Sequence, residues 1–460
     1  MASAIIQQEP QRSRTPRGRD VLWDVIDEHL AEADFLAGQW LAVARSSRIS
    51  ARARQLTIEP RLIAHVDGLV LGGATVADRA LWPLLAVGEP DDTVPMMAAA
   101  LALLADADGA TVDRLVERLR DTRDAAVRAA IGKAFEITAR ADVSEPVRLA
   151  LYATDVPQAQ AVLLEILAGR RVAPGPISGA LLASPSESVR AAALSAVAAI
   201  GGLDREPHLT HVEDGLAHAS PAVREAARRT GLVWNLRSAW QSCISQACAG
   251  DLGAMIDWAS LGGASAVAAL AAQLSSPPSS PPASPLSSRS ALFALGFSGS
   301  PEAVDACMPM LSDSDPAVAR LAAEAVGAIT GLDVSEAPFA SPPPEDDTGE
   351  PLREVDPAEL DLAPTDELPS PAPDAIRTWW RERRGAFATQ VRYLRGQPWS
   401  LEAVQRALGE GPLRRTGPLA REIAIRTGGR GALDAFRLGQ ARPTLPAEIE
   451  AALHREPAWR

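Results

Sequence analysis

Apolar residues recur along this chain at a nearly constant distance, each time behind a short polar opening. The opening usually reads Ser-Pro or Asp-Pro and then Val-Arg, and an alanine-rich amphipathic stretch follows. One equivalent apolar position is held by Val94, Val127, Val189, Val223, Leu286 and Val318, with gaps of 33, 62, 34, 63 and 32 residues. These gaps are one or two periods of about 32 residues, which is typical of an α-solenoid. The pattern therefore predicts an all-α fold of stacked helix pairs, each burying its apolar face against the next.

One unit shows why these residues should form a helix pair. Ser300-Pro301 opens a first helix over 302–311, and Asp315-Pro316 opens a second one. Aspartate caps free amides at a helix start, and proline at the first helical position loses no hydrogen bond. The second helix has the spacing of one buried face at Val318, Leu321, Ala322, Ala325, Val326 and Ile329. Alanine on this face lets neighbouring helices approach closely, and such units look like HEAT repeats.

The repeats are expected to cover residues 75–333, and the chain before them differs in composition. Residues 1–19 are polar and rich in arginine, proline and glutamine, which predicts a disordered tail. Residues 20–74 contain two amphipathic helical patterns, over 21–43 and 61–71. End repeats of a solenoid need a polar outer face, so we expect 20–74 to form an N-terminal helical cap.

Proline marks two interruptions in the later part of the chain. The Pro/Ser-rich run 275–288 cannot continue a helix and is expected to be a loop inserted between repeats. Residues 334–375 are acidic and rich in proline, which predicts a disordered linker. Helical patterning resumes in a C-terminal helical segment, 376–445, whose first helix is expected over 375–394. Residues 446–460 are expected to be a tail.

Charge is distributed unevenly between these segments. The net charge of the chain is −13, yet residues 376–460 contain sixteen arginines against eight carboxylates, next to a linker with twelve carboxylates and one arginine. We expect the basic segment to dock on the end of the repeats through Trp379 or Trp380. Consecutive helical residues point about 100° apart, so one ring is expected inside the protein, and a contact with a partner is the alternative.

Composition also excludes several classes of protein. An acidic repeat body argues against a nucleic-acid groove, which needs clustered positive charge. The three cysteines, Cys243, Cys248 and Cys307, form neither a CxxC pair nor an even set, so no disulfide framework or zinc site is predicted. No apolar run reaches membrane-spanning length and no secretory signal is visible. We therefore expect a cytoplasmic protein that binds neither membranes nor nucleic acids.

The sequence contains few groups with the pattern of a reaction centre. Neither a GxxxxGK[ST] loop nor a GxSxG turn occurs. His208, His211 and His218 lie close enough to share a metal, but ordinary loop or helix-face histidines are the favoured interpretation. His29 and His65 each lie beside carboxylates and could act in acid–base pairs, although an orienting hydrogen bond within the cap is favoured. No catalytic residue, cofactor site or metal site is predicted.

Three segments together resemble a known family. They are Glu28–Leu36, the run RLIAHVDGL over 61–69, and Trp379-Trp380 with the later run RYLRGQP over 392–398. They resemble an uncharacterised proteobacterial family of HEAT-repeat proteins, some of whose members are encoded near type VI secretion clusters. The Pro/Ser-rich insertion and the irregular unit near Met255 depart from that family. The resemblance marks these candidate interaction residues: Arg61, His65, Asp67, Gly68, Trp379, Trp380, Arg392 and Tyr393.

These observations favour a non-enzymatic scaffold or adaptor that binds another protein, with an accessory role in type VI secretion as a further expectation from the resemblance. The concave surface of a solenoid is extended and suits a protein better than a small molecule, so no small-molecule substrate is expected. An enzyme-like HEAT protein such as a bilin lyase is the alternative, and it would need a deep pocket with a proton donor. A HEAT-type DNA-repair glycosylase would need a positive concave face.

Overall fold

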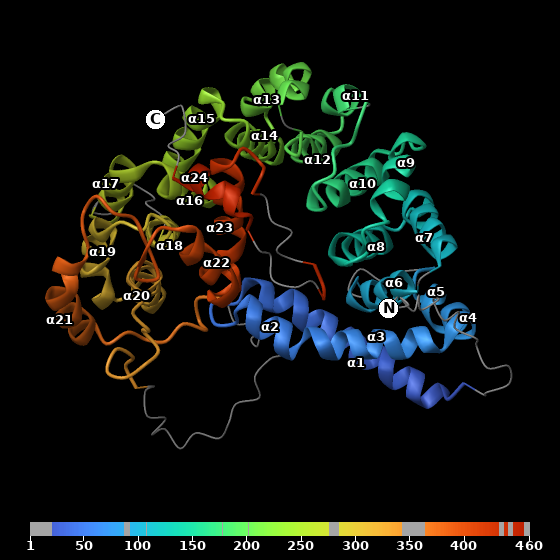
Figure 1. Ribbon diagram of the computed structural model, residues 1–460, viewed down its shortest axis with the longest axis horizontal. Coiled ribbons are helices and arrows are strands. Elements are labelled where there is room, and N and C mark those ends of the chain that lie inside the picture. The colour runs from blue at the N-terminus through green and yellow to red at the C-terminus, as the bar shows by residue number, and fades with distance from the viewer. Residues whose placement is uncertain are drawn as a thin grey trace, which may run out of the picture.

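Helix pairs follow one another along the chain and build a curved double row (Figure 1). The computed structural model describes residues 21–86, 93–106, 108–176, 178–200, 202–275, 285–342, 364–431, 437–439 and 445–454. The expected disordered tail therefore lies outside the described residues, as do most of the Pro/Ser-rich insertion and the middle of the expected linker. Within the described part of 75–333 every regular element is a helix.

The inner row of the arc holds the helices that carry the repeated apolar stripe. These helices are α6 (Thr93–Ala105), α8 (Ala125–Ile137), α10 (Pro157–Gly169), α12 (Glu187–Val197), α14 (Pro221–Val233), α16 (Leu252–Leu261), α18 (Pro285–Leu295) and α20 (Pro316–Thr330). Neighbouring inner helices contact each other from α6 to α14 and from α16 to α20, and α15 and α23 connect α14 to α16. The two units that the repeat spacing skips are filled by α10 and α16, so the prediction of a helical-repeat solenoid is confirmed.

The outer row holds the partner helices, each packed on the inner helix that follows it. They are α7 (Gly109–Asp121), α9 (Ser144–Tyr152), α11 (Ser178–Leu182), α13 (Leu209–Leu216), α15 (Arg237–Cys248), α17 (Gly263–Ser275) and α19 (Pro301–Cys307), with the 3-10 turns η3 (Gly202–His208) and η4 (Pro309–Ser312).

Local sequence explains where the inner helices begin and how they pack. The Asp124 carboxylate accepts from the amides of Ala126 and Val127 at the start of α8, and Asp315 does the same for Ala317 at α20. The predicted stripe is buried, with Val189 wholly inside the inter-repeat core. Gly331 ends α20 with a φ of 77°, a left-handed conformation that glycine adopts without strain.

The arginine that follows the repeated valine has a structural role. Arg128 Nε donates to the Leu119 carbonyl near the end of α7, and Arg224 Nη1 donates to the His218 carbonyl just beyond α13, over 2.7 Å. The last carbonyls of a helix lack partners within it and carry partial negative charge, so a guanidinium there both caps and stabilises the helix. These two arginines therefore stabilise the repeat itself.

The N-terminal helices lie where the sequence places them. They are α1 (Trp23–Ala42), η1 (Val43–Arg45), α2 (Ala51–Thr57), α3 (Glu59–Leu71), α4 (Gly73–Val76), the π-helical turn η2 (Ala77–Leu81) and α5 (Trp82–Leu84). Helices α1 and α3 pack on each other and on α6, the first inner helix. The extra helix α2 lies between the two predicted helices and contacts α22 in the C-terminal part of the chain.

The C-terminal part is less helical than expected. It contains α21 (Pro373–Arg383), η6 (Arg384–Ala386), β1 (Tyr393–Leu394), β2 (Gln397–Pro398), α22 (Leu401–Glu410), α23 (Leu413–Arg426), η7 (Ala447–Ile449) and α24 (Glu450–Leu453). The prediction of a helix over 375–394 is wrong beyond α21 and η6. Arg395 and Gly396 have φ values of 51° and 79°, and such a two-residue turn forms a β-hairpin in which β1 pairs with β2.

Two segments expected to be unstructured are packed where the structure describes them. In the linker, the Glu367 carboxylate accepts hydrogen bonds from Ser46 Oγ and from the Ser47 amide, at 2.8 and 2.7 Å, and the adjoining Leu368 is buried. In the tail, Leu453 is completely buried. Composition misses both because a few well-placed contacts suffice to order a short segment.

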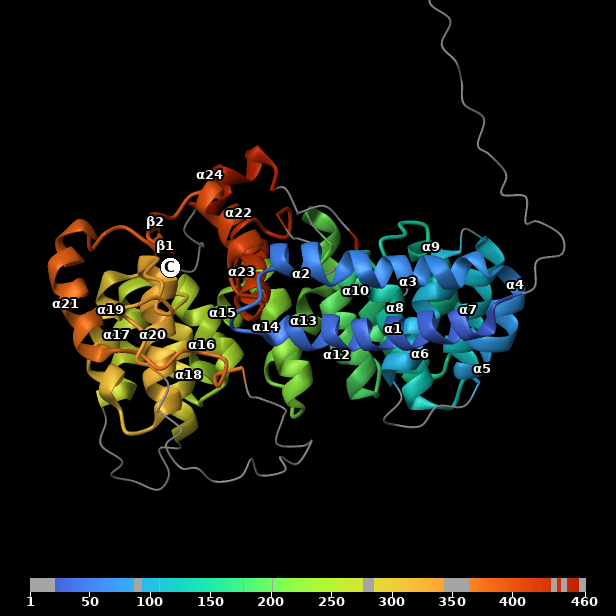
Figure 2. The same cartoon turned by 90° about the horizontal axis from the view of Figure 1, so that it is seen from below.

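The C-terminal helices lie inside the arc and close it. We define the C-terminal unit as residues 399–426 and 445–453, which have a core of their own. Helix α23 contacts α14 and α16, and α22 contacts α2. The Leu413 amide donates to the Ile49 carbonyl over 2.8 Å. Figure 2 shows the unit between the N-terminal helices and the last repeats. Docking was expected at the end of the repeats; α21 and the hairpin lie there, whereas the unit fills the concave side.

We predict that Val189→Asp destabilises the repeats by about 3 to 5 kcal/mol, because it leaves an unpaired charge in the inter-repeat core. Ser195→Asp, at an exposed position of the same helix, is the control and should change stability by less than about 0.5 kcal/mol. Urea unfolding followed by circular dichroism measures both. Equal losses of stability in the two variants would show that the buried and exposed faces of this helix are assigned wrongly.

Candidate functional site

The N-terminal motif residues join α3 to α1. His65 Nδ1 lies 3.0 Å from His29 Nδ1, so one ring donates and the other accepts. Gly68 faces the same ring, and a Cβ at this position would lie 2.6 Å from His29 Nε2. The favoured orienting hydrogen bond is therefore present, and Gly68 allows the close approach that it needs. Arg61 lies 3.7 Å from Glu32 in an exposed ion pair, and Asp67 is exposed.

The tryptophan pair joins α21 to the last repeat. Trp380 is 4% exposed, and its Nε1 donates to Asp305 Oδ1 over 2.7 Å. Trp379 is partly buried and packs edge-on against Phe339, with ring centroids 6.4 Å apart. Trp380 makes the expected contact inside the protein. Trp379 is partly exposed, so the alternative of a contact with a partner applies to Trp379.

Arg392 and Tyr393 fix the hairpin to the repeats. The Tyr393 amide donates to the Gly299 carbonyl over 2.8 Å, and Arg392 Nη2 donates to the Phe297 carbonyl over 2.9 Å. At the hairpin tip, the amides of Arg395 and Gly396 donate to the Ala328 and Ile329 carbonyls at 2.9 Å each. The hairpin thus caps the C-terminal end of α20. Of the candidate interaction residues, Asp67 is left on the surface without a tertiary contact.

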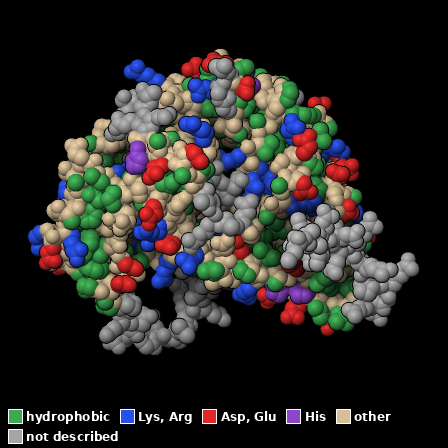
Figure 3. Space-filling view, in the orientation of Figure 1, with side chains coloured by type: hydrophobic (Ala, Val, Ile, Leu, Met, Phe, Trp, Pro, Cys, Tyr) green, Lys and Arg blue, Asp and Glu red, His purple; other side chains and the backbone are tan. Residues whose placement is uncertain are grey.

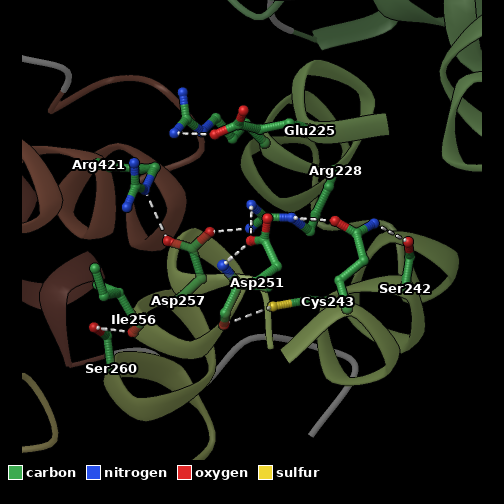
Figure 4. Close-up of polar contacts among 12 residues, drawn as sticks. Glu225, Arg228, Ser242, Cys243, Asp251, Ile256, Asp257, Ser260 and Arg421 are labelled. Atoms are coloured by element: carbon green, nitrogen blue, oxygen red, sulfur yellow. Dashed lines mark hydrogen bonds and ion pairs between the residues drawn. The ribbon is translucent and has the colours of Figure 1, made fainter. Parts of the chain in front are cut away.

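The strongest polar constellation lies elsewhere, where α23 meets the inner helices. Figure 4 shows Asp257 of α16 between two arginines. Its carboxylate is 3% exposed; one oxygen pairs with Nη1 of the fully buried Arg228, and the other accepts from Arg421 Nε of α23 over 2.7 Å. Gln246 and Asp251 complete the surroundings of Arg228 at 3.2 and 3.5 Å. This contact ties the concave face to α23.

The same arrangement of one buried carboxylate with two arginines occurs twice more. Glu324 of α20 holds Arg414 through two hydrogen bonds, the Nε one measuring 2.9 Å, and has Arg415 Nη1 at 3.6 Å. Glu422 of α23 accepts from Arg392 Nη2 over 2.7 Å and from Arg426 Nε over 2.6 Å. We call the region of these three carboxylates and their six arginines the seam.

The seam is electrostatically unusual because its arginines outnumber its carboxylates. Burial by itself would raise the pKa of the Glu422 carboxyl, but the charges and hydrogen bonds of Arg392 and Arg426 outweigh it, so the pKa lies below its ordinary value. Burial lowers the pKa of Arg415 to about 10 although Glu324 opposes the shift. Glu422 and Arg415 are therefore both charged at neutral pH. Figure 3 shows Lys and Arg side chains around the middle of the molecule.

The seam is not predicted from the sequence, although two features of the sequence are consistent with it. Asp257 and Glu324 are acidic residues within otherwise apolar inner helices, at positions that face the concave side. Arg414, Arg415, Arg421 and Arg426 recur along α23 among its apolar residues. Neither feature shows, without the tertiary structure, that the two sets meet.

The described residues offer no group of three or more His, Cys, Asp or Glu side chains arranged to hold a metal ion. His218 instead accepts a hydrogen bond from the Ser220 amide over 3.1 Å. Across the described ranges, no helix is both long and apolar enough to cross a membrane.

Comparisons with known proteins add little to this picture. No protein-family profile matches the chain, and no curated protein matches it. A solved structure of YibA from Escherichia coli is similar over 67% of this chain and 97% of YibA, at 13% identity and a TM-score of 0.28. That likeness is too low to carry an argument about function. The resemblance to the proteobacterial HEAT-repeat family stays a prediction.

We predict that Gly68→Ala lowers stability by about 1 kcal/mol, since overlap with His29 exceeds the gain that alanine normally brings to a helix. In the His29→Ala background the same substitution should become stabilising, and a double-mutant cycle of denaturation free energies measures the coupling. Gly109→Ala, where a Cβ meets nothing within 4 Å, is the control. Destabilisation that persists without the His29 ring would refute this role of Gly68.

Proposed function

We propose that the protein is a non-enzymatic scaffold whose concave groove over α14–α20 binds an arginine-bearing helix of a partner protein. The observation that carries this proposal is the way the groove holds α23. Asp257 and Glu324 are buried acidic groups on inner helices, and each receives an arginine from α23. The groove therefore has the chemistry of a receptor for a basic amphipathic helix, with α23 as its tethered occupant.

Charge makes such a groove selective. Arg414 and Arg415 both belong to α23, so a replacing helix without arginines at these positions would leave the buried Glu324 carboxylate without either partner. Removing one member of a buried ion pair costs about 3 to 5 kcal/mol, much of it from the stranded charge. Apolar helices are therefore rejected, and basic helices with the spacing of α23 are accepted.

The C-terminal unit is built so that α23 can exchange with a partner. Leu419, Ala420 and Ile423 of α23 belong to the core of the unit itself, together with Trp399, Val404 and Leu408. Toward the inner helices, the unit presents the arginines that pair with Asp257 and Glu324, and Ile425 joins the core of the last repeats. A unit that keeps its own core loses little apolar burial when it leaves the groove. Tethering favours the bound state through a high local concentration, which a partner must overcome.

The resemblance at the two ends of the chain adds the expected setting, a bacterial cytoplasm and a partner that belongs to type VI secretion. This part of the proposal depends on identifying the partner. Mass spectrometry of proteins captured by the opened variant described below, with each hit retested as a purified protein, decides it.

The direct test uses a labelled peptide with the sequence of residues 411–428 and the full-length chain. Arg414→Glu places like charges beside Glu324 and should release α23, so this variant should bind the peptide at least about tenfold more tightly than the wild type. Glu324→Arg also disfavours closure, but it destroys the acidic receptor and should not bind. Fluorescence anisotropy gives the affinities.

Two controls keep this test sharp. Arg406→Glu changes an exposed charge of α22 that pairs with Glu402 and should behave as the wild type does. The double exchange Arg414→Glu with Glu324→Arg should close the groove again and reject the peptide. Equal peptide binding by the two single variants would rule out recognition through Glu324.

A further inference from the structure

A cavity of about 350 Å³ lies within the closed ring, beside the seam. Its walls come from six parts of the chain: residues 296–297 after α18, α20 and the residues after it, the loop at 47–48, residues 368–369, the hairpin with Arg392, and helices α22 and α23. The volume is in the range of small-molecule sites. Because distant segments build it together, the cavity is complete only while the ring is closed.

Arg415 is the polar group that this cavity leaves incompletely satisfied. Its side chain is 12% exposed and packs over the Phe297 ring at 3.9 Å from the centroid. Gly296 makes the room, since a Cβ there would lie 2.8 Å from Arg415 Nη2. Nη1 makes no hydrogen bond, and its nearest carboxylate oxygen, Glu324 Oε1, is 3.6 Å away and already bonded to Arg414. A buried guanidinium without full compensation is costly.

The positive charge around the cavity exceeds what the carboxylates compensate. Glu324 and Glu422 each serve two arginines. Of the remaining lining carboxylates, Glu410 pairs with Arg52, and Asp333 accepts hydrogen bonds from Ser335 and keeps its charge. Arg48 and Arg395 also line the cavity, are exposed, and form no ion pair with any carboxylate in the described ranges. An anion would find three guanidinium groups there.

The rest of the wall is apolar. Leu332, Leu368 and Leu419 are buried side chains that line the cavity, and Phe297 adds an aromatic face. A bare inorganic anion would leave these surfaces empty, whereas an organic anion would cover them and gain from burial of its own apolar surface.

We propose that this cavity is a binding site for a small organic anion, whose carboxylate or phosphate contacts Arg415, Arg395 and Arg48 and whose apolar body packs on the leucines and Phe297. The site differs from the groove for a partner helix and does not depend on that function. A ligand here stabilises the closed ring, because it binds only where all the walls are assembled.

The test is calorimetric titration of the full-length protein with three probes of one shape: naphthoate, naphthyl phosphate and the neutral naphthalenemethanol. At least one of the two anions should bind saturably and at least about tenfold more tightly than the neutral probe. The tighter anion identifies the acid group that the site prefers. The same anion should raise the melting temperature of the wild type.

Two variants test the site itself. Arg415→Gln should weaken binding of the preferred anion about tenfold or more. Ala328→Phe fills the cavity without removing a charge and should abolish binding of all three probes, which keeps the test valid if Arg415→Gln folds poorly. Arg289→Gln, in an ion pair with Asp315 away from the cavity, is the control. Absence of saturable binding, equal affinity for the neutral probe, or unchanged binding by both site variants would overturn the proposal.

Discussion

The structure depends on one kind of contact: a buried carboxylate shared by two arginines. Taking such ions out of water is costly, and the cost is recovered only when geometry and hydrogen bonding are good. Asp257 meets this condition with Arg228 and Arg421, and Glu324 meets it with Arg414, while Arg415 stays at 3.6 Å from Glu324. Buried ion pairs of this kind contribute reliably to the specificity of a contact and less reliably to the free energy of folding. They select which helix enters the concave groove and at which register.

This contact changes what a solenoid of this kind can do. A simple arc presents its concave face to any partner, but here α23 already fills the part over α14–α20 and the N-terminal helices complete the ring. The motif residues at the two ends support this arrangement. His65 and Gly68 align α3 with α1. Arg392 and Tyr393 fix the hairpin under α23. Their structural contacts explain their presence without a partner.

The sequence predicts the periodic part of this structure well and the closure poorly. Stripe residues such as Val189 and Val318 repeat at a fixed spacing, and each unit contacts its neighbours in sequence, so a one-dimensional pattern contains the needed information. The contact between Glu324 and Arg414 joins residues 90 positions apart and leaves no periodic trace. Glu367 shows the same limit, because an acidic, proline-rich composition hides one carboxylate that three donors from Ser46 and Ser47 satisfy.

The central claim is that these buried ion pairs hold the ring closed, and an intramolecular distance tests it most directly. Spin labels at Leu56 of α2 and Glu402 of α22, both exposed, span the closure, and Cys248→Ser removes the exposed native thiol. Pulsed electron paramagnetic resonance should give a single short distance between the two labels in the otherwise native chain. In Glu324→Arg it should give a broad distribution of longer distances. A broad distribution in the native chain, or an unchanged short distance in the variant, would contradict the account.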